Sequence, residues 1–316
     1  MTLQQLRAFI AIVESGSFRR GAAALGVSQA GLTGSLQALE STLGVQLLQR
    51  SARGVKLTPE GERLLPRAQL ITTEAERAEE DVQPQRDGVS STLRVGLGPT
   101  PTAVLLPLVV PHFHQAHPSV RLRLLSGFHE RLQPALQSGQ IELAITAIPD
   151  SGVEPGLSTR LLFQSELVVV SRRAHPLVHA QSLADLRDCE WVLLGSPGGP
   201  GSSIIRVCQE HGLPPPAIAA TCESFIQLSA LIAMTDWLAL VPAQLPEKGL
   251  LGLQTAVIRV HEEIRGSDNS LIYRSEVPLT RPAAAFAAMC ESMSRILMRP
   301  STDSGKNAPA SAAGVR

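Results

Sequence analysis

Hydroxyl and amide side chains recur at helical spacing between residues 28 and 37. They are Ser28, Gln29, Thr33 and Gln37. A glutamine amide can hydrogen-bond to adenine at two points in the major groove of DNA, and a serine or threonine hydroxyl can reach bases or phosphates. A polar helix face is more often simply solvated, so the surrounding residues must decide between the two interpretations.

Positively charged side chains surround this polar row. Residues 1–58 hold six basic and two acidic side chains, a net charge of +4, although the 316-residue chain has 28 of each sign. Residues 59–90 have the opposite balance, with four basic and eight acidic side chains. The sequence therefore predicts a basic DNA-binding domain over residues 1–58, followed by an acidic segment over residues 59–90. The basic candidates comprise four for phosphate contacts, Arg19, Arg20, Arg50 and Lys56, and Arg53 for a narrow minor groove.

Glycines and serines divide residues 1–58 into short helices. Apolar spacing predicts a first helix that ends at Gly16, a second from Ser17 to Leu25, and a third from Ser28 to about Leu43. Residues 47–58 read as two short strands around a turn at Arg53 and Gly54. Three helices and a hairpin, with a tight glycine turn before the polar helix, predict a winged helix-turn-helix over residues 1–58.

A long helix is expected to begin at Thr58, because an N-cap residue, a proline and an acid follow one another there. Pro66 should kink this helix. Apolar residues along it alternate four and three positions apart, as in a coiled coil: Leu64, Ala68, Ile71, Ala75, Ala78 and Val82. Residues 59–90 are therefore predicted to form a linker and dimerisation helix with a hinge, and to pair with a second copy.

Strands and helices alternate after residue 90, which is typical of an open, mostly parallel α/β sheet. Two sheets are expected, in two lobes with a ligand cleft and hinge motion between them. Lobe I should comprise about 91–162 and 267–300, and lobe II about 163–266. The whole effector-binding region would span 91–300, and residues 301–316 should be a disordered tail.

Two turns of this region could face the cleft. The stretches 98–102 and 195–203 each follow an expected strand and begin an expected helix, so their N–H groups favour a small anion. Neither stretch contains Arg or Lys, which leaves recognition to helix dipoles and hydroxyls. Ordinary helix caps are the alternative interpretation. The candidate effector-binding residues are Thr100, Thr102, Ser126, Thr146, Gly201, Ser202 and Ser203.

Other classes of site and location are disfavoured. The glycines of 195–203 lack the spacing of a nucleotide loop, and the histidines of 112–117 lack further ligands for a metal, so no cofactor or metal is predicted. The N-terminus does not resemble a signal peptide and no apolar run is long enough to span a membrane. The four cysteines form no C-x-x-C pair, and we expect a cytoplasmic protein.

The N-terminal residues also carry a family resemblance. AAALGVSQAGLTGSLQALESTLGVQLLQR (22–50), followed by GVKLTPEG, is similar to the signature of the LysR-type bacterial transcriptional regulators. The sequence departs from that pattern at Ala30–Gly31, Gly34 and Leu48, and each added glycine costs the helix about 1 kcal/mol relative to alanine. The resemblance implies a two-lobed effector domain like periplasmic binding proteins, and a homotetramer. A fainter resemblance is to regulators of aromatic-acid and sulfonate breakdown.

The resulting hypothesis is a ligand-responsive regulator that binds promoter DNA sequence-specifically. Its co-inducer would be a small organic anion, an aromatic carboxylate or sulfonate, and RNA polymerase would be a further partner. One alternative is a regulator that senses redox state, with Cys222 as the candidate thiol, or uses the α/β domain only to oligomerise. An enzyme is disfavoured, since no nucleophile elbow or paired carboxylates are visible.

Overall fold

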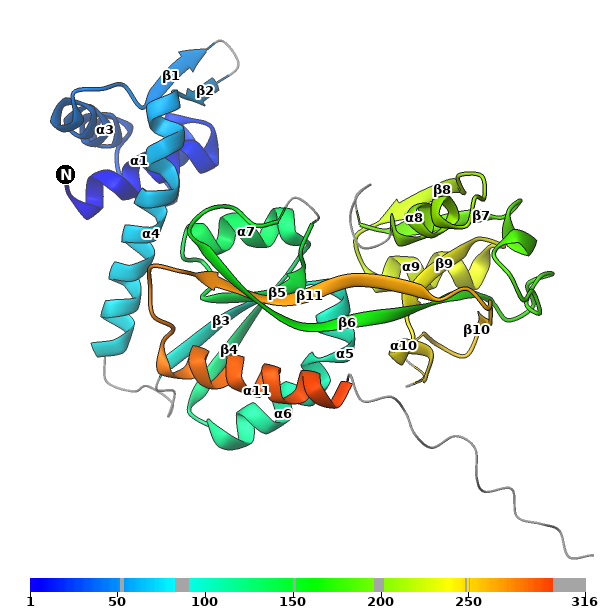
Figure 1. Ribbon diagram of the computed structural model, residues 1–316. Helices are drawn as coiled ribbons and strands as arrows, with labels where there is room; N and C mark the ends of the chain where they lie inside the picture. The colour runs from blue at the N-terminus through cyan, green and yellow to red at the C-terminus, as the bar shows by residue number, and fades with distance from the viewer. Residues whose placement is uncertain are drawn as a thin grey trace, which may run out of the picture.

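The computed structural model describes residues 1–51, 54–82, 91–149, 152–195, 202–247, 249 and 251–297 (Figure 1). The hinge after residue 82 and the tail at 301–316 lie outside these ranges, as do Arg53 and Gly201. The side chain of Arg50 is likewise not described. Among the described residues, no helix combines the length and the apolarity that crossing a membrane requires.

The N-terminal domain has the predicted three helices and hairpin. Gly26 ends the second helix with φ +66°, a left-handed conformation that glycine adopts without strain, and this turn allows the third helix to begin at once. Phe9, Ile12, Leu32 and Leu39 are buried between the helices and form the centre of the domain core. The elements are α1 (Leu3–Ser15), α2 (Phe18–Leu25), α3 (Gln29–Leu43), β1 (Leu48–Ser51) and β2 (Gly54–Leu57).

The linker helix α4 (Pro59–Val82) extends from this domain towards the rest of the chain (Figure 1). Thr58 caps it, accepting a hydrogen bond from the Gly61 N–H at 3.0 Å. The predicted apolar seam is divided along the helix. Ala68 is fully buried against the N-terminal domain of its own chain, whereas Ile71 and Ala78 further along are exposed.

One continuous nine-stranded sheet runs through both lobes, in the order β4-β3-β5-β11-β6-β9-β7-β8, with β10 paired to β6. The prediction of two separate, mostly parallel sheets was therefore wrong. β6 (Leu157–Arg172) and β11 (Ile264–Arg274) are long antiparallel strands that pass from one lobe into the other (Figure 1). The sheet is mixed, because these two strands run antiparallel to their neighbours. The remaining strands are β3 (Ser91–Leu97), β4 (Val120–Ser126), β5 (Leu143–Ala147), β7 (Glu190–Leu194), β8 (Ala217–Cys222), β9 (Leu238–Pro242) and β10 (Thr255–Ile258).

Helices cover the sheet separately in each lobe. In lobe I, α6 and α11 pack together over a core that includes Phe113 and Phe286, whose rings meet edge to face at 5.1 Å. In lobe II, α8 and α9 cover cores around Trp191 and Leu228. The helices of this domain are α5 (Pro99–Val104), α6 (Leu106–Ala116), α7 (His129–Gln137), α8 (Ser203–Glu210), α9 (Phe225–Met234), α10 (Gln244–Glu247) and α11 (Arg281–Leu297), with the short turn η1 (Ala184–Leu186).

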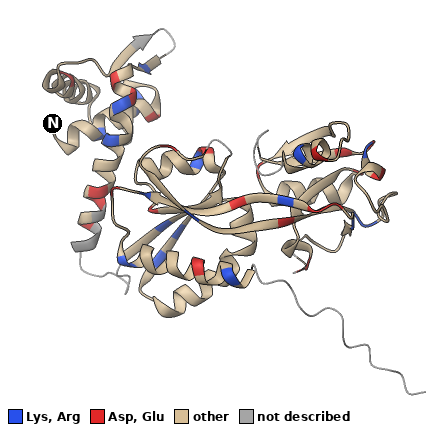
Figure 2. Cartoon of the chain, viewed as in Figure 1, with Lys and Arg blue, Asp and Glu red and all other residues tan. Residues whose placement is uncertain are grey.

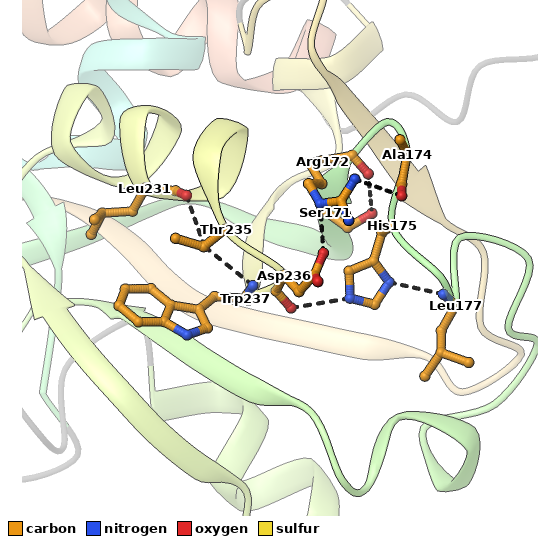
Figure 3. A network of polar contacts seen from close by, with 9 residues as sticks. All are labelled: Ser171, Arg172, Ala174, His175, Leu177, Leu231, Thr235, Asp236 and Trp237. Carbon is orange, nitrogen blue, oxygen red and sulfur yellow. Dashed lines mark hydrogen bonds and ion pairs between the residues drawn. The ribbon is translucent and has the colours of Figure 1, made fainter.

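A polar network fixes the end of β6 in lobe II (Figure 3). The imidazole of His175 is buried, its Nε2 donates to the Asp236 carbonyl, and its Nδ1 accepts from the Leu177 N–H, both at 3.0 Å. Arg172 bonds the Asp236 carboxylate and the Ala174 carbonyl. The hydrogen bond from Arg172 holds the pKa of Asp236 below its ordinary value. The network thus joins the end of β6 and the loop that follows it to the turn that precedes β9.

We expect His175→Gln to destabilise lobe II. Losing the imidazole leaves at least one backbone group of the network without its partner, at a cost of about 1–3 kcal/mol. Both tryptophans, Trp191 and Trp237, lie in this lobe, so intrinsic fluorescence during urea unfolding reports on it. His179→Gln is the matched control, since His179 is exposed on the same loop. Equal midpoints for the two variants would contradict the assigned role.

Candidate DNA-binding surface and effector cleft

The N-terminal half of α3 presents the predicted polar row. Ser28 caps the helix by accepting a hydrogen bond from the Gly31 N–H at 3.1 Å, and Gln29 and Gln37 are exposed. Thr33 donates its hydroxyl to the Gln29 carbonyl at 2.9 Å, so this donor is engaged within the helix. The two glutamines are therefore the described side chains of the row best placed to meet a base edge.

Exposed cations flank α3. Arg19 and Arg20 on α2 and Lys56 on β2 are all exposed. Figure 2 shows acidic residues instead on the part of α4 furthest from the N-terminal domain. A polyanion approaching the N-terminal domain therefore meets positive charge there and negative charge further along α4.

A hollow of about 550 Å³ beside α3 was not anticipated. Thr33 and Gln37 line it on the helix side, and Gln46 and Gln49 line it from the segment that leads into the wing. Glu40 of α3 holds the start of the wing close to the helix. Its Oε1 accepts from the Leu47 N–H at 2.7 Å and from the Leu48 N–H at 3.3 Å, which brings the wing back against α3.

A cleft of about 640 Å³ lies between the two lobes of the α/β domain. Its floor is made by β5 and β11, and the first turns of α7 and α8 stand on opposite walls. Apolar side chains share the lining with polar ones. The apolar residues are Phe128, Ala147, Ile148, Pro149 and Leu161, and the polar ones include His129, Glu130, Thr146, Gln164, Ser202, Ser203, Arg206, Ser267, Asp268 and Ser270.

Two buried hydroxyls face each other on the cleft floor. Thr146 of β5 and Ser270 of β11 are directly opposite in the strand register, and their exposed fractions are 1% and 3%. Within the described part of the chain, neither hydroxyl has a hydrogen-bond partner. A hydroxyl can donate and accept hydrogen bonds, so this pair is suited to a polar group of a bound molecule.

Two charged side chains, Arg206 and Asp268, also line the cleft. Arg206 of α8 donates to the Arg265 carbonyl at 2.6 Å and lies 3.8 Å from Glu210. Opposite charge comes from Asp268, whose Oδ1 accepts from the Gln164 amide at 3.0 Å. The cleft therefore offers one guanidinium, held in place by β11, beside hydrogen-bond acceptors.

The structure divides the predicted effector-binding residues. Thr146, Ser202 and Ser203 line the cleft, whereas Thr100, Thr102 and Ser126 do not. Thr102 donates its hydroxyl to the Gly98 carbonyl at 2.7 Å within α5, a helix of only six residues. Ser126 is exposed at the end of the edge strand β4. The expected second helix N-terminus on the cleft is that of α7, not that of α5.

Arg206 lines the cleft although the sequence analysis left recognition to helix dipoles and hydroxyls. Arg206 follows Ser202 and Ser203 by four and three residues, a spacing that brings side chains to the same face of a helix. Helical periodicity extended one turn beyond the glycine-rich stretch would have found it. Ser270 and Asp268 had no comparable signal, because their place on the floor depends on how far β11 continues.

The cysteines have the properties of unreactive thiols. Burial raises the pKa of Cys189, Cys208 and Cys222 above that of an ordinary thiol, and it raises the pKa of Cys290 to about 12. Oxidation proceeds through the thiolate, which a raised pKa disfavours at neutral pH.

Family comparisons agree with this arrangement. Residues 3–62 match the model of the bacterial regulatory helix-turn-helix protein, lysR family, and residues 86–295 match that of the LysR substrate binding domain. The chain belongs to the LysR family. It is therefore a ligand-responsive transcriptional regulator with an N-terminal DNA-binding domain and an α/β effector domain.

Several named relatives illustrate the family. The SDS degradation transcriptional activation protein of Pseudomonas sp. (strain ATCC 19151) is 34% identical over 76% of this chain and 78% of its own length. BenM of Acinetobacter baylyi is 29% identical over 92% of this chain and 99% of its own. A probable hydrogen peroxide-inducible genes activator of Streptomyces viridosporus is 33% identical over 76% and 77%.

Solved structures of family members are similar over most of their length. The LysR-family regulator CbnR has a TM-score of 0.70 and 26% identity, over 93% of this chain and 99% of its own. A structure of CbnR complexed with its target DNA has a TM-score of 0.68 and 27% identity, over 93% and 100%.

For the DNA-binding surface, we expect Gln29→Ala to lose about 1–3 kcal/mol of binding free energy on the cognate promoter and to relax specificity, because a base-edge contact is removed. Lys56→Ala should weaken binding to all sequences and lower the salt slope by about 1, since a phosphate contact is removed. Fluorescence anisotropy at several salt concentrations separates these effects. Gln4→Ala, an exposed glutamine on α1, is the control. Wild-type affinity and salt slope for both variants would refute the assignment.

Proposed function

We propose that the cleft between the lobes binds a small organic anion, an aromatic carboxylate or sulfonate, as co-inducer. The observation that carries this proposal is the placement of Arg206 on the wall of a cleft that also has an apolar side. Phe128, Ile148 and Leu161 would pack against a ring, while the guanidinium bonds the anionic group. Ser202 and Ser203, at the start of α8, would add hydroxyls and the positive end of the helix dipole.

The polar floor would orient the ligand within the cleft. A carboxylate or sulfonate can accept more hydrogen bonds than one guanidinium donates to it, and an additional hydroxyl on the ring would also need a partner. Thr146 and Ser270 can each donate or accept, so they suit either group. The apolar wall sets the size of the molecule, and the floor selects for a polar atom at its inner end.

The relatives' names favour a small-molecule effector without identifying it. One relative is named for the degradation of SDS, an anionic sulfate ester, and others for induction by hydrogen peroxide. A peroxide-sensing role suits this chain less well, because burial raises the pKa of each of its cysteines.

The regulator would act on promoter DNA as a homo-oligomer. Ile71 and Ala78 of the predicted seam are exposed on α4, and a second copy of the helix would cover them. Gln29 and Gln37 of each copy would read a half-site, with Ser28, Thr33, Arg19, Arg20, Arg50, Arg53 and Lys56 supporting them. A homodimer through α4, assembled into a tetramer and working with RNA polymerase, completes the proposal.

Arg206→Gln tests the anion site. Removing a charged hydrogen-bond donor should cost about 1.5–3 kcal/mol, which is roughly a 10- to 150-fold loss of affinity. Isothermal titration of the full-length protein with benzoate, benzenesulfonate and dodecyl sulfate provides the measurement. Arg187→Gln is the control, because Arg187 is an exposed arginine of the same lobe that pairs only with its neighbour Asp188 among the described residues. If none of the three anions binds the wild-type protein, the proposed effector class is wrong.

A further inference from the structure

Helix α4 touches both the DNA-binding domain and the effector domain. On one side it packs against α1, where the Gln69 amide donates to Glu14 at 3.5 Å and Arg7 lies 3.6 Å from Glu76. On the other side it contacts α7 of lobe I. A movement of lobe I relative to α4 must therefore change the position of the DNA-binding domain or break one of these contacts.

Gly139 permits the close approach of α4 to lobe I. This residue follows α7 with φ +75°, and a side chain there would place its Cβ 2.9 Å from the Leu70 methyl group and 3.6 Å from Thr73. The turn after α7 is thus seated directly on α4. The packing of Gly139 against Leu70 positions the ion pair between Arg274 and Glu74 beside it.

Arg274 forms the charged part of this contact. It is the last residue of β11, and its side chain is only 11% exposed. One guanidinium nitrogen donates to the Leu136 carbonyl at 2.8 Å, and the other lies 3.2 Å from the Glu74 carboxylate of α4. Leu136 is in the last turn of α7, where a cation also interacts favourably with the helix dipole. A single guanidinium thus joins β11, α7 and α4.

The two elements that Arg274 joins in lobe I, α7 and β11, line the cleft at the ends that lie away from Arg274. α7 contributes His129 and Glu130 to the cleft, and β11 contributes Asp268 and Ser270. The α7 helix is nine residues long, or roughly 13 Å, and its last turn accepts the hydrogen bond from Arg274. A shift of either element at the cleft is therefore transmitted to its far end, where Arg274 lies.

Irregular pairing in β11 gives the cleft end freedom to move. The register between β11 and β6 shifts between Arg265 and Asp268 and again between Asn269 and Ser270, at the cleft. From Asn269 to Tyr273 the strand pairs regularly with β5. The irregular segment can respond to a ligand, and the regular segment carries the response to Arg274.

We propose that the Arg274–Glu74 contact couples the cleft to the linker helix, and through it to the DNA-binding domain. The inference rests on the proposed function in that it takes the cleft as the effector site. Arg274 is a positioning residue, since it lies outside the cleft. Ligand in the cleft changes how α7 and β11 meet at the guanidinium, and this shifts the equilibrium between docked and released α4.

Coupling between two sites is reciprocal, so it can be tested from the linker side with no ligand present. Hydrogen–deuterium exchange of the full-length protein would compare wild type with Glu74→Gln, which keeps the shape and removes the charge. We expect exchange about three- to tenfold faster in the cleft segments 128–132 and 264–270, as well as in α4. The double charge swap, Glu74→Arg with Arg274→Glu, should restore slow exchange relative to Glu74→Arg alone.

A matched control breaks a different ion pair of the same lobe. Arg160 of β6 lies 2.9 Å from Glu291 of α11, so Glu291→Gln removes a comparable contact outside the proposed coupling site. Exchange changes confined to α4 and the last turn of α7 in Glu74→Gln would overturn the proposal, as would an equal response of the cleft segments in Glu291→Gln. Because no ligand is added, an effector of a different class would leave this result unchanged.

Discussion

Two antiparallel strands, β6 and β11, carry both lobes of the effector domain on one hydrogen-bonded ladder. The rest of the domain depends on this constraint. Each lobe has its own apolar core, so each can move as a unit, but any relative movement must pass through the shared strands. The ladder is irregular where it passes the cleft and regular on either side. Bending is thereby confined to the segment that a ligand can touch.

This arrangement explains why polar groups are buried at the cleft. A strand in the middle of a lobe is apolar on both faces, whereas the crossing segment of β11 carries Ser267, Asp268, Asn269 and Ser270. The Thr146 and Ser270 hydroxyls can donate or accept hydrogen bonds, so a polar ligand in the cleft can bond to them. A closed arrangement of the lobes is then favoured by the ligand and not by the chain alone.

The local rules of helix capping were sufficient to predict where the helices of the N-terminal domain begin and end. Ser17 and Ser28 cap helices as their positions predict, and Gly16, Gly26 and Gly44 end helices in the left-handed conformation. These signals depend on neighbours in the sequence, so they survive without knowledge of the fold. The strands of the effector domain were located equally well where they were continuous apolar runs.

The cleft was harder to predict because it depends on the two crossing strands. Polar residues such as Gln164 and Ser267 interrupt the apolar runs of β6 and β11, so both strands appeared shorter than they are. The turn at Thr100 was expected on the cleft, where the first turn of α7 stands instead. Arg206 was missed for a different reason, because it lies one helical turn beyond the glycine-rich stretch. Side chains that meet only through long-range pairing leave little trace in a single sequence.

The proposed cleft and the proposed contact at Arg274 together imply that a ligand in the cleft and DNA at α3 are energetically linked through the strands and the linker helix. The most direct test is calorimetric titration of a confirmed co-inducer into the full-length protein, with and without saturating promoter DNA. Linkage predicts that DNA changes the affinity of the co-inducer by about 5- to 150-fold, which corresponds to a coupling free energy of about 1–3 kcal/mol. Identical affinities in the two titrations would contradict the account.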